Sequence, residues 1–204
     1  MSSHPKGERI SQDAYLTPPE LTRAMLSLAG DLRRYESICD PSAGEGAFIK
    51  AARDLRYKKK LIAIDIRPEC RVPCEKAGAT TFRCWDFLDT ETHTHELDLD
   101  LIVANPPFSG LVPHVTRYLE LLRDRKASRV MVLARVGFLA TKRRTSFWRE
   151  WWPLFDSFTP LVQRPSFTFG GTDSSEYGIF QFSRTASFAV VRPPLDWKGE
   201  SHEG

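Results

Sequence analysis

Apolar stretches of strand length and stretches with helical spacing alternate along this chain, and that alternation is the strongest constraint on its fold. Seven strands are predicted, at Ser37–Cys39, Leu61–Asp65, Thr80–Arg83, Leu99–Ala104, Arg129–Leu133, Phe158–Gln163 and Ile179–Phe182. Helices are predicted between them, at Gly46–Arg56, Pro68–Ala77, Val112–Arg123 and Thr145–Trp151. Such alternation predicts an α/β fold, in which a mostly parallel seven-stranded sheet is covered by helices on both faces.

Two further elements are predicted at the ends of this alternating region. A first helix begins after Thr17, whose hydroxyl would cap it, since prolines follow at once and Glu20 stands three residues past the cap. Near the other end, Tyr177–Phe182 and Ser187–Arg192 form a candidate hairpin. It would add antiparallel strands at one edge of the sheet.

The length of 204 residues favours one domain with a substantial core. Residues 1–12 and 193–204 are polar and lack periodicity, so we expect two flexible tails around a single domain at 13–192. The longest apolar run, around Leu101–Ala104, is far shorter than the roughly 18 residues of a membrane span. No apolar stretch follows the first residues as in a secretion signal, and we expect a cytoplasmic protein with no membrane partner.

The net charge of +3 permits a polyanionic partner and does not establish one, because solubility alone accounts for such a balance. The four cysteines, Cys39, Cys70, Cys74 and Cys84, form no Cys-x-x-Cys pair and have no histidine at zinc spacing. We therefore expect structural thiols and no metal site.

A glycine-containing turn with acidic residues follows the first predicted strand. Its sequence from Asp40 is Asp-Pro-Ser-Ala-Gly-Glu-Gly, with Ser42 and Gly44 inside the turn and Glu45 beside them. The glycines allow a tight turn and a close approach of a ligand to the backbone. A phosphate would be repelled by these carboxylates, so the turn favours a cationic ligand over a phosphate. An ordinary strand-to-helix turn with capping acids is the alternative at this point.

Two more acids end the next two predicted strands. Asp65 lies 21 residues beyond Gly44, and an acid at that place commonly accepts hydrogen bonds from the two ribose hydroxyls of a nucleoside. Asp86 follows the third strand and could bind an adenine amino group while Phe87 packs on the ring. Acids at three successive strand ends are harder to explain as helix caps than one would be.

The sequence Asn105-Pro106-Pro107-Phe108 ends the fourth predicted strand. Two consecutive prolines restrict the backbone, so that the Asn105 side chain and the Pro106 carbonyl can present acceptors at a rigid spacing. Such acceptors would bind both hydrogens of an exocyclic amine and make its nitrogen nucleophilic, while Phe108 would stack on the planar group. These three residues are the catalytic candidates.

At these residues the chain resembles the amino-methyltransferases that use S-adenosylmethionine, and most closely the N6-adenine DNA methyltransferases of bacteria and phages. Asp40–Phe48 looks like their first motif and Asn105–Phe108 like their catalytic motif. The resemblance implies a Rossmann-like methyltransferase fold with S-adenosylmethionine as cofactor. The cofactor site that we expect contains Tyr15, Thr17, Asp40, Ser42, Gly44, Asp65, Ile66, Asp86, Phe87 and Asn105.

The substrate that the resemblance implies is DNA, with the target adenine flipped out of the duplex. Phe108 would stack on this base, and Phe167 lies in a later loop similar to one that flanks the target base in compact phage enzymes. Phosphate contacts are expected from Lys142, Arg143, Arg144 and Arg164, although solvated loop charge explains these residues equally well.

Other substrates remain alternatives. The same motif would serve an RNA methyltransferase acting on adenine N6 or guanine N2, and the protein amide of glutamine poses the same chemical problem. A binding module that retains the fold without activity is a further alternative, in a different class. Because no separate recognition domain is present in the sequence, we expect a short or relaxed target, and the oligomeric state is not predicted.

Overall fold

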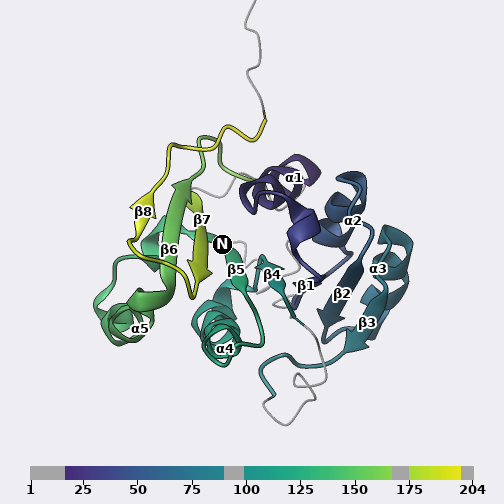
Figure 1. The fold of residues 1–204 in the computed structure, drawn as a ribbon, viewed down its shortest axis with the longest axis horizontal. Helices are drawn as coiled ribbons and strands as arrows, with labels where there is room; N and C mark the ends of the chain where they lie inside the picture. Colours follow the sequence, from purple (N-terminus) through teal and green to yellow (C-terminus); the bar gives the residue numbers. More distant parts are fainter. Residues whose placement is uncertain (1–16, 90–98, 167–174, 199–204) are drawn as a thin grey trace, which may run out of the picture.

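One eight-stranded sheet organises the chain, in the order β3-β2-β1-β4-β5-β7-β6-β8 (Figure 1). The computed structural model describes residues 17–89, 99–166 and 175–198. The strands are β1 (Ser37–Asp40), β2 (Lys60–Asp65), β3 (Thr81–Cys84), β4 (Leu101–Ala104), β5 (Arg129–Arg135), β6 (Phe155–Pro160), β7 (Tyr177–Ser183) and β8 (Val190–Val191). Only β7 runs antiparallel to its neighbours among the described strands. The expected α/β fold with a mostly parallel sheet is therefore confirmed.

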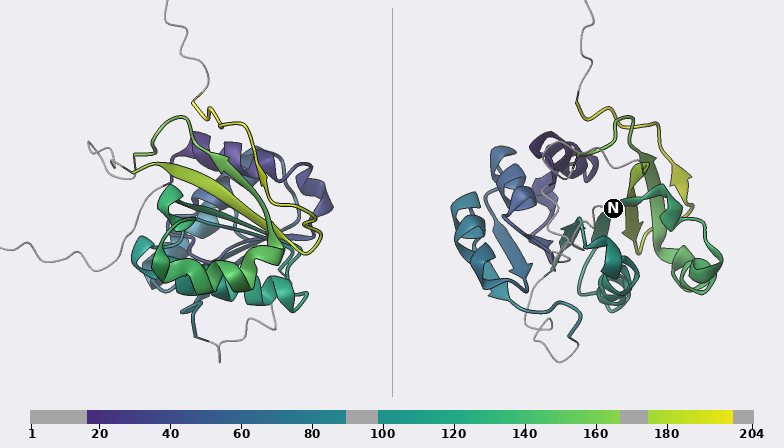
Figure 2. Two further views of the ribbon diagram at one scale, coloured as in Figure 1. Left: turned by 90° about the vertical axis from the view of Figure 1, so that its left-hand side faces the viewer. Right: turned by 180° about the vertical axis from the view of Figure 1, so that it is seen from behind.

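Helices cover both faces of this sheet (Figures 1 and 2). The α-helices are α1 (Pro19–Leu28), α2 (Ala47–Asp54), α3 (Arg71–Ala77), α4 (Leu111–Arg123) and α5 (Thr145–Trp151). Short 3₁₀ turns lie at η1 (Leu32–Arg34), η2 (Pro68–Cys70), η4 (Phe108–Gly110), η5 (Val136–Phe138), η6 (Lys142–Arg144) and η7 (Trp152–Leu154). The first three helices share one hydrophobic cluster, and α4 and α5 share the other.

Successive strand residues alternate between these two clusters, as the pleat of a strand requires. In β4, Leu101 and Val103 belong to the cluster under α1–α3, whereas Ile102 and Ala104 belong to the cluster under α4 and α5. All four side chains are buried. Because both faces of these parallel strands are buried, their sequences are continuously apolar, and this is the pattern from which the strands were predicted.

The C-terminal strands differ from the expectation. The predicted hairpin of Tyr177–Phe182 with Ser187–Arg192 is wrong, because β7 inserts between β5 and β6, and β8 pairs in parallel with β6. β8 lies within the predicted segment Ser187–Arg192, and it brings the sheet to eight strands where seven were predicted. The sixth strand begins at Phe155, three residues before its predicted start, and ends at Pro160.

Two smaller expectations also fail. Thr17 is not the N-cap of the first helix: Pro18 occupies that position, and no side chain donates or accepts there. Cys84 is exposed on the edge strand β3, whereas Cys39, Cys70 and Cys74 are buried free thiols. Within the described ranges, no helix is long and apolar enough to cross a membrane, and no three potential metal ligands gather.

A dense aromatic group supports the α5 side of the sheet. Phe180 is fully buried on β7, and its ring centroid lies 5.2 Å from that of Phe138 and 4.8 Å from that of Phe158. Trp148 of α5 packs against the same ring and donates its indole N–H to the Phe138 carbonyl at 2.8 Å. These contacts hold α5 against the antiparallel part of the sheet.

We expect Phe180→Ala to lower the free energy of unfolding by about 3 to 5 kcal/mol, because it opens a cavity among packed rings. Phe188, which is 84% exposed, provides the control: Phe188→Ala should change it by less than about 0.5 kcal/mol. Urea denaturation monitored by circular dichroism measures both. A cost below about 1 kcal/mol for Phe180→Ala would contradict this packing.

Candidate active site

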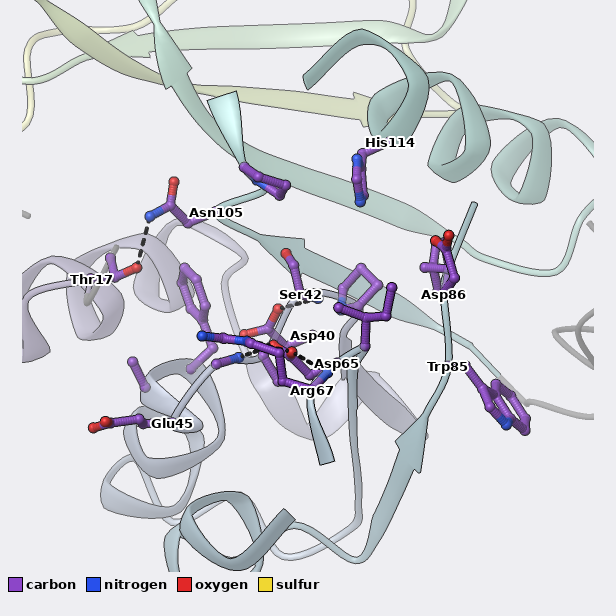
Figure 3. Close-up of a pocket in the computed structure, with 18 of the residues that line it drawn as sticks. Thr17, Asp40, Ser42, Glu45, Asp65, Arg67, Trp85, Asp86, Asn105 and His114 are labelled. Carbon is purple, nitrogen blue, oxygen red and sulfur yellow. Dashed lines mark hydrogen bonds and ion pairs between the residues drawn. The ribbon is translucent and has the colours of Figure 1, made fainter. Parts of the chain in front are cut away.

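A cavity of about 420 Å³ opens where β1, β2, β3 and β4 end (Figure 3). Most of the residues expected to bind a cofactor line it: Thr17, Asp40, Ser42, Gly44, Asp65, Ile66, Asp86, Phe87 and Asn105. Tyr15, the remaining one, lies outside the described residues. Neighbouring strands in an open parallel sheet leave such a crevice where the strand order reverses, here between β1 and β4.

The turn after β1 forms one wall of the cavity. Gly44 and Gly46 have φ values of 53° and 83°, a left-handed conformation that glycine adopts at little cost. A Cβ at Gly46 would also lie 3.1 Å from the Cα of Cys74, so the backbone approaches α3 closely. The turn thus brings backbone N–H groups and the Glu45 side chain to the edge of the cavity.

Asp65 joins this turn to the end of β2. Its Oδ2 accepts the Gly44 N–H at 2.8 Å, and its Oδ1 accepts the backbone N–H of Arg67 at 3.0 Å. The Arg67 guanidinium adds Nε to Oδ1 at 2.9 Å and Nη2 to Oδ2 at 3.2 Å. Burial alone would raise the pKa of Asp65, but these hydrogen bonds hold it below its usual value.

Arg67 is a site residue that the sequence analysis missed. It lines the cavity two residues after Asp65, and it occupies acceptor positions that ribose hydroxyls would need. The spacing Asp-x-Arg was the available signal, because a side chain at that distance can fold back onto the carboxylate. A ribose bound by Asp65 therefore has to displace at least one arm of this guanidinium.

Asp40 is buried at the base of the cavity. Its Oδ1 accepts the Ser42 N–H at 3.1 Å, and its side chain is 2% exposed. Burial, with a smaller contribution from the nearby charge of Asp65, raises the pKa of Asp40 to about 8 against the lowering effect of the Ser42 hydrogen bond. A cation bound in this cavity would favour the ionised form of Asp40.

Asn105 stands at the end of β4 on the opposite wall. Its Nδ2 donates to the Thr17 hydroxyl at 3.1 Å, which orients the amide (Figure 3). Its Oδ1 is buried and has no hydrogen-bond partner in the described part of the chain. Because an unpaired buried acceptor is costly, this oxygen is suited to a donor on a bound molecule. Thr17, expected as a helix cap, instead positions this amide.

The residues after Asn105 have different surroundings. Pro106 is buried and Pro107 lines the cavity, whereas Phe108 lies outside the set of lining residues. The Arg135 guanidinium carbon lies 4.8 Å from the centroid of the Phe108 ring, and the Tyr177 ring lies 5.6 Å from it. Arg135 Nε donates to the Tyr177 hydroxyl at 3.1 Å. Arg135 was not anticipated, because its pairing with Tyr177 depends on the insertion of β7 beside β5.

At the far end of the cavity, the adenine-binding candidates differ in exposure. Ile66 is 59% exposed, whereas Phe87 is 2% exposed and packs against Tyr118, with ring centroids 5.4 Å apart. Phe87 therefore offers little of its ring face to a ligand. Asp86 is exposed, and its Oδ1 accepts the Leu88 N–H at 2.9 Å.

None of the expected phosphate contacts is among the residues that line this cavity. Lys142 and Arg143 are exposed on η6, while Arg144 donates to the Gly137 carbonyl and covers the Phe138 ring. Arg164 forms an ion pair with Glu176, which offsets its charge. Phe167, the expected helper at the target base, lies outside the described residues.

Comparisons with known proteins place this fold. No model of a protein family matches the chain. A type II methyltransferase, M.CvrRI of Paramecium bursaria Chlorella virus XZ-6E, is 25% identical over 103 residues. That match covers 50% of this chain and 26% of the viral protein, so the chain spans about a quarter of this relative.

Three solved structures illustrate the structural likeness. A putative RNA methyltransferase from Pyrococcus horikoshii has a TM-score of 0.65 at 18% identity, over 87% of this chain and 91% of that one. A putative class I S-adenosylmethionine-dependent methyltransferase from Listeria monocytogenes has a TM-score of 0.65 at 11% identity. The match covers 93% of this chain and 69% of that one. TrmK of M. capricolum, solved with S-adenosylhomocysteine, has a TM-score of 0.53 at 12% identity. The match covers 81% of this chain and 69% of that one. The chain has the Rossmann-like fold of class I methyltransferases.

The buried Asp40 carboxyl predicts an unusual pH dependence of stability. Between about pH 4 and pH 8 the folded chain keeps this proton while the unfolded chain loses it, so stability falls as pH rises, by at most about 1.4 kcal/mol per unit. Asp40→Asn lacks this proton. Its free energy of unfolding, relative to that of the unsubstituted chain, should therefore increase up to about pH 8 and then level off. Denaturant titrations across this range measure the difference, and a constant difference would contradict a protonated Asp40.

Proposed function

We propose that this chain is an S-adenosylmethionine-dependent methyltransferase that methylates the exocyclic N6 of adenine in DNA. The observation that carries the proposal is the buried, unpaired Oδ1 of Asn105, held at one wall of the cavity that Asp65 lines from the other. An acceptor without a donor, beside a cofactor-sized cavity, suits the amino group of a substrate. The fold of class I methyltransferases supports the same conclusion.

The cavity suits S-adenosylmethionine in both charge and shape. Asp65 would accept the ribose hydroxyls, after the Arg67 guanidinium leaves at least one carboxylate oxygen. Glu45 provides negative charge on the turn after β1, and a bound cationic ligand would favour the ionised form of Asp40 beside it. The exposed Ile66 offers an apolar surface for the adenine. When bound, this cofactor supplies a methyl group on a sulfonium centre.

Asn105 and Pro106 would activate the substrate. Their oxygens accept the two hydrogens of the amino group, which draws the nitrogen lone pair out of conjugation with the ring and makes it nucleophilic. Thr17 keeps the Asn105 oxygen directed at the substrate, because it binds the amide nitrogen. Rate enhancement would then come from positioning and fixed dipoles, and a strongly basic side chain is not required.

The target base would need to leave the duplex to reach Asn105, because its amino group is otherwise paired. Phe108 is the residue proposed to stack on it, supported from one side by Arg135 and Tyr177. Lys142 and Arg143 are exposed cations for nearby phosphates. The loops that the structure describes around the cavity are short, so the proposed target sequence is short or relaxed.

RNA is the second candidate substrate. The observation that favours it is the match of 87% of this chain to a structure described as a putative RNA methyltransferase. The match to a type II methyltransferase favours DNA over a shorter part of the chain. We place DNA first because the resemblance of the Asn-Pro-Pro-Phe motif is to enzymes that act on adenine in DNA.

Asn105→Ala should reduce methyl transfer by about a hundredfold to a thousandfold, because one preorganised acceptor is lost. Binding of S-adenosylhomocysteine should change little, since the ribose and cation contacts remain. Turnover is measured with radiolabelled cofactor and binding by calorimetry. A variant that keeps more than about half of its turnover would show that the chemistry does not depend on this oxygen.

Asp65→Ala should weaken S-adenosylmethionine binding by roughly 2 to 4 kcal/mol, because charge-assisted contacts to the ribose are lost. Arg67→Ala is the matched control: it removes the competing guanidinium and should leave the affinity unchanged or tighter. Calorimetry on both variants separates the two roles. Equal weakening by both substitutions would contradict this account. It would mean that the intact Asp65–Arg67 ion pair is required for cofactor binding and that the ligand does not displace the guanidinium.

The substrate is identified by incubating the chain with radiolabelled S-adenosylmethionine and separate pools of DNA, RNA and protein. Hydrolysis of the labelled pool to nucleosides, followed by chromatography, identifies the methylated base. N6-methyladenosine from RNA, or N2-methylguanosine, would replace DNA adenine as the substrate. Label in glutamine of the protein pool would exclude a nucleic acid. No transfer to any pool, with cofactor binding intact, would favour a silent binding module.

A further inference from the structure

His114 is a half-buried histidine that the proposed reaction does not use. It lies in the first turn of α4, four residues after Gly110, and its side chain lines the cavity. Figure 3 shows its ring directed from α4 into the cavity, on the side of Asp86 rather than that of Asn105. Asp86 lines the same cavity and lies on the same side of it as His114 (Figure 3).

The hydrogen bonding of His114 determines its tautomer. Nδ1 lies 2.8 Å from the Gly110 carbonyl oxygen, and because a carbonyl only accepts, Nδ1 carries the hydrogen. Burial lowers the pKa of His114, against opposing effects of this hydrogen bond and of Asp86, so the ring is neutral at physiological pH. Nε2 is then a lone-pair acceptor with no hydrogen of its own.

Gly110 makes this arrangement possible. A Cβ at position 110 would lie 3.0 Å from Nδ1 and 3.1 Å from Cε1 of His114, so a larger residue would push the ring away from the backbone. The edge of the Tyr118 ring supports the imidazole one turn further along α4, with centroids 6.3 Å apart. The ring is therefore held from two sides, and Nε2 has a restricted direction.

Asp86 is the other acceptor at this end of the cavity, and it is the less selective one. Its side chain is exposed, so water competes for it, and one of its oxygens already accepts the Leu88 N–H. The half-buried His114 ring, which has a fixed direction, discriminates more strongly than an exposed acceptor, because a ligand that fails to donate covers it and leaves it without a donor.

We propose that His114 is a specificity-determining residue for the cofactor, and that its Nε2 accepts a hydrogen bond from the exocyclic amino group of the adenine in S-adenosylmethionine. This inference rests on the proposed function, since it takes S-adenosylmethionine as the ligand. Asp65 would bind the ribose, and His114 would distinguish adenine from bases that carry a carbonyl oxygen at the same position. A carbonyl oxygen at that position is itself an acceptor, so it could not form a hydrogen bond with the lone pair of Nε2.

The test compares two ligands that differ only at this position: S-adenosylhomocysteine and S-inosylhomocysteine, in which a carbonyl oxygen replaces the amino group. Calorimetry gives the ratio of their dissociation constants. The unsubstituted chain should prefer the adenine ligand by roughly 10-fold to 100-fold, the effect of one acceptor that the bound ligand leaves without a donor. No binding of S-adenosylhomocysteine at all would refute the proposed function itself, which separates that failure from the failure of this inference.

His114→Gln is the informative variant, because its amide can turn to accept from an amine or donate to a carbonyl. It should bind S-adenosylhomocysteine within about threefold of the unsubstituted chain and bring the ratio close to one. His114→Phe should weaken S-adenosylhomocysteine and also remove the preference. A residue that only fills space would lower both affinities together and leave the ratio unchanged.

Asp86→Asn is the matched control at the same end of the cavity. It should leave most of the preference for adenine in place, since the proposal assigns that preference to His114. The proposal is overturned if both His114 variants keep the ratio of the unsubstituted chain, or if Asp86→Asn abolishes it while His114→Gln does not.

Discussion

The hydrogen bond from the Gly44 N–H to Asp65 Oδ2 connects the two chain segments on which the rest of the site depends. It joins the turn after β1 to the end of β2, at the same edge of the sheet. The turn is left-handed at Gly44 and Gly46, so without an anchor its direction would be poorly determined. Asp65 supplies that anchor with one oxygen and is stabilised as an anion by Arg67.

The order of the strands determines what faces this anchored turn. β4 lies on the other side of β1 from β2, so its end places Asn105 across the cavity from Asp65. Thr17, just before α1, accepts a hydrogen bond from the amide of Asn105 and thereby connects the start of the described chain to the cavity wall that contains Asn105. A ligand between these walls meets a carboxylate on one side and an unpaired amide oxygen on the other.

The parallel part of the sheet could be predicted because strands buried on both faces have continuous apolar sequences, as Leu101–Ala104 shows. The acids at the strand ends could be placed together for the same reason, since parallel strands share one carboxyl edge. The pairing of β7 and β8 could not be predicted, and the exposed Val190 and Val191 carry no burial pattern that would show which strand β8 pairs with. The contact of Arg135 with Phe108 depends on the pairing of β7 with β5, so it could not be predicted either.

His114 and Arg67 show a different limit. Both act through contacts to residues only two to four positions away, so the spacing was visible in the sequence. What the sequence did not show is the direction of these side chains into the cavity. That direction depends on the close approach of the His114 ring to Gly110 and on the fit of the Arg67 guanidinium to a half-buried turn.

A crystal structure of the chain with S-adenosylhomocysteine is the most direct test of the central claim that this cavity binds the cofactor for transfer at Asn105. We expect the ribose hydroxyls on the Asp65 carboxylate, the Arg67 guanidinium displaced from at least one oxygen, and the ligand sulfur on the Asn105 side. Electron density for the ligand outside this cavity, or inside it with the Asp65–Arg67 pair intact and the sulfur turned toward Asp86, would contradict the account.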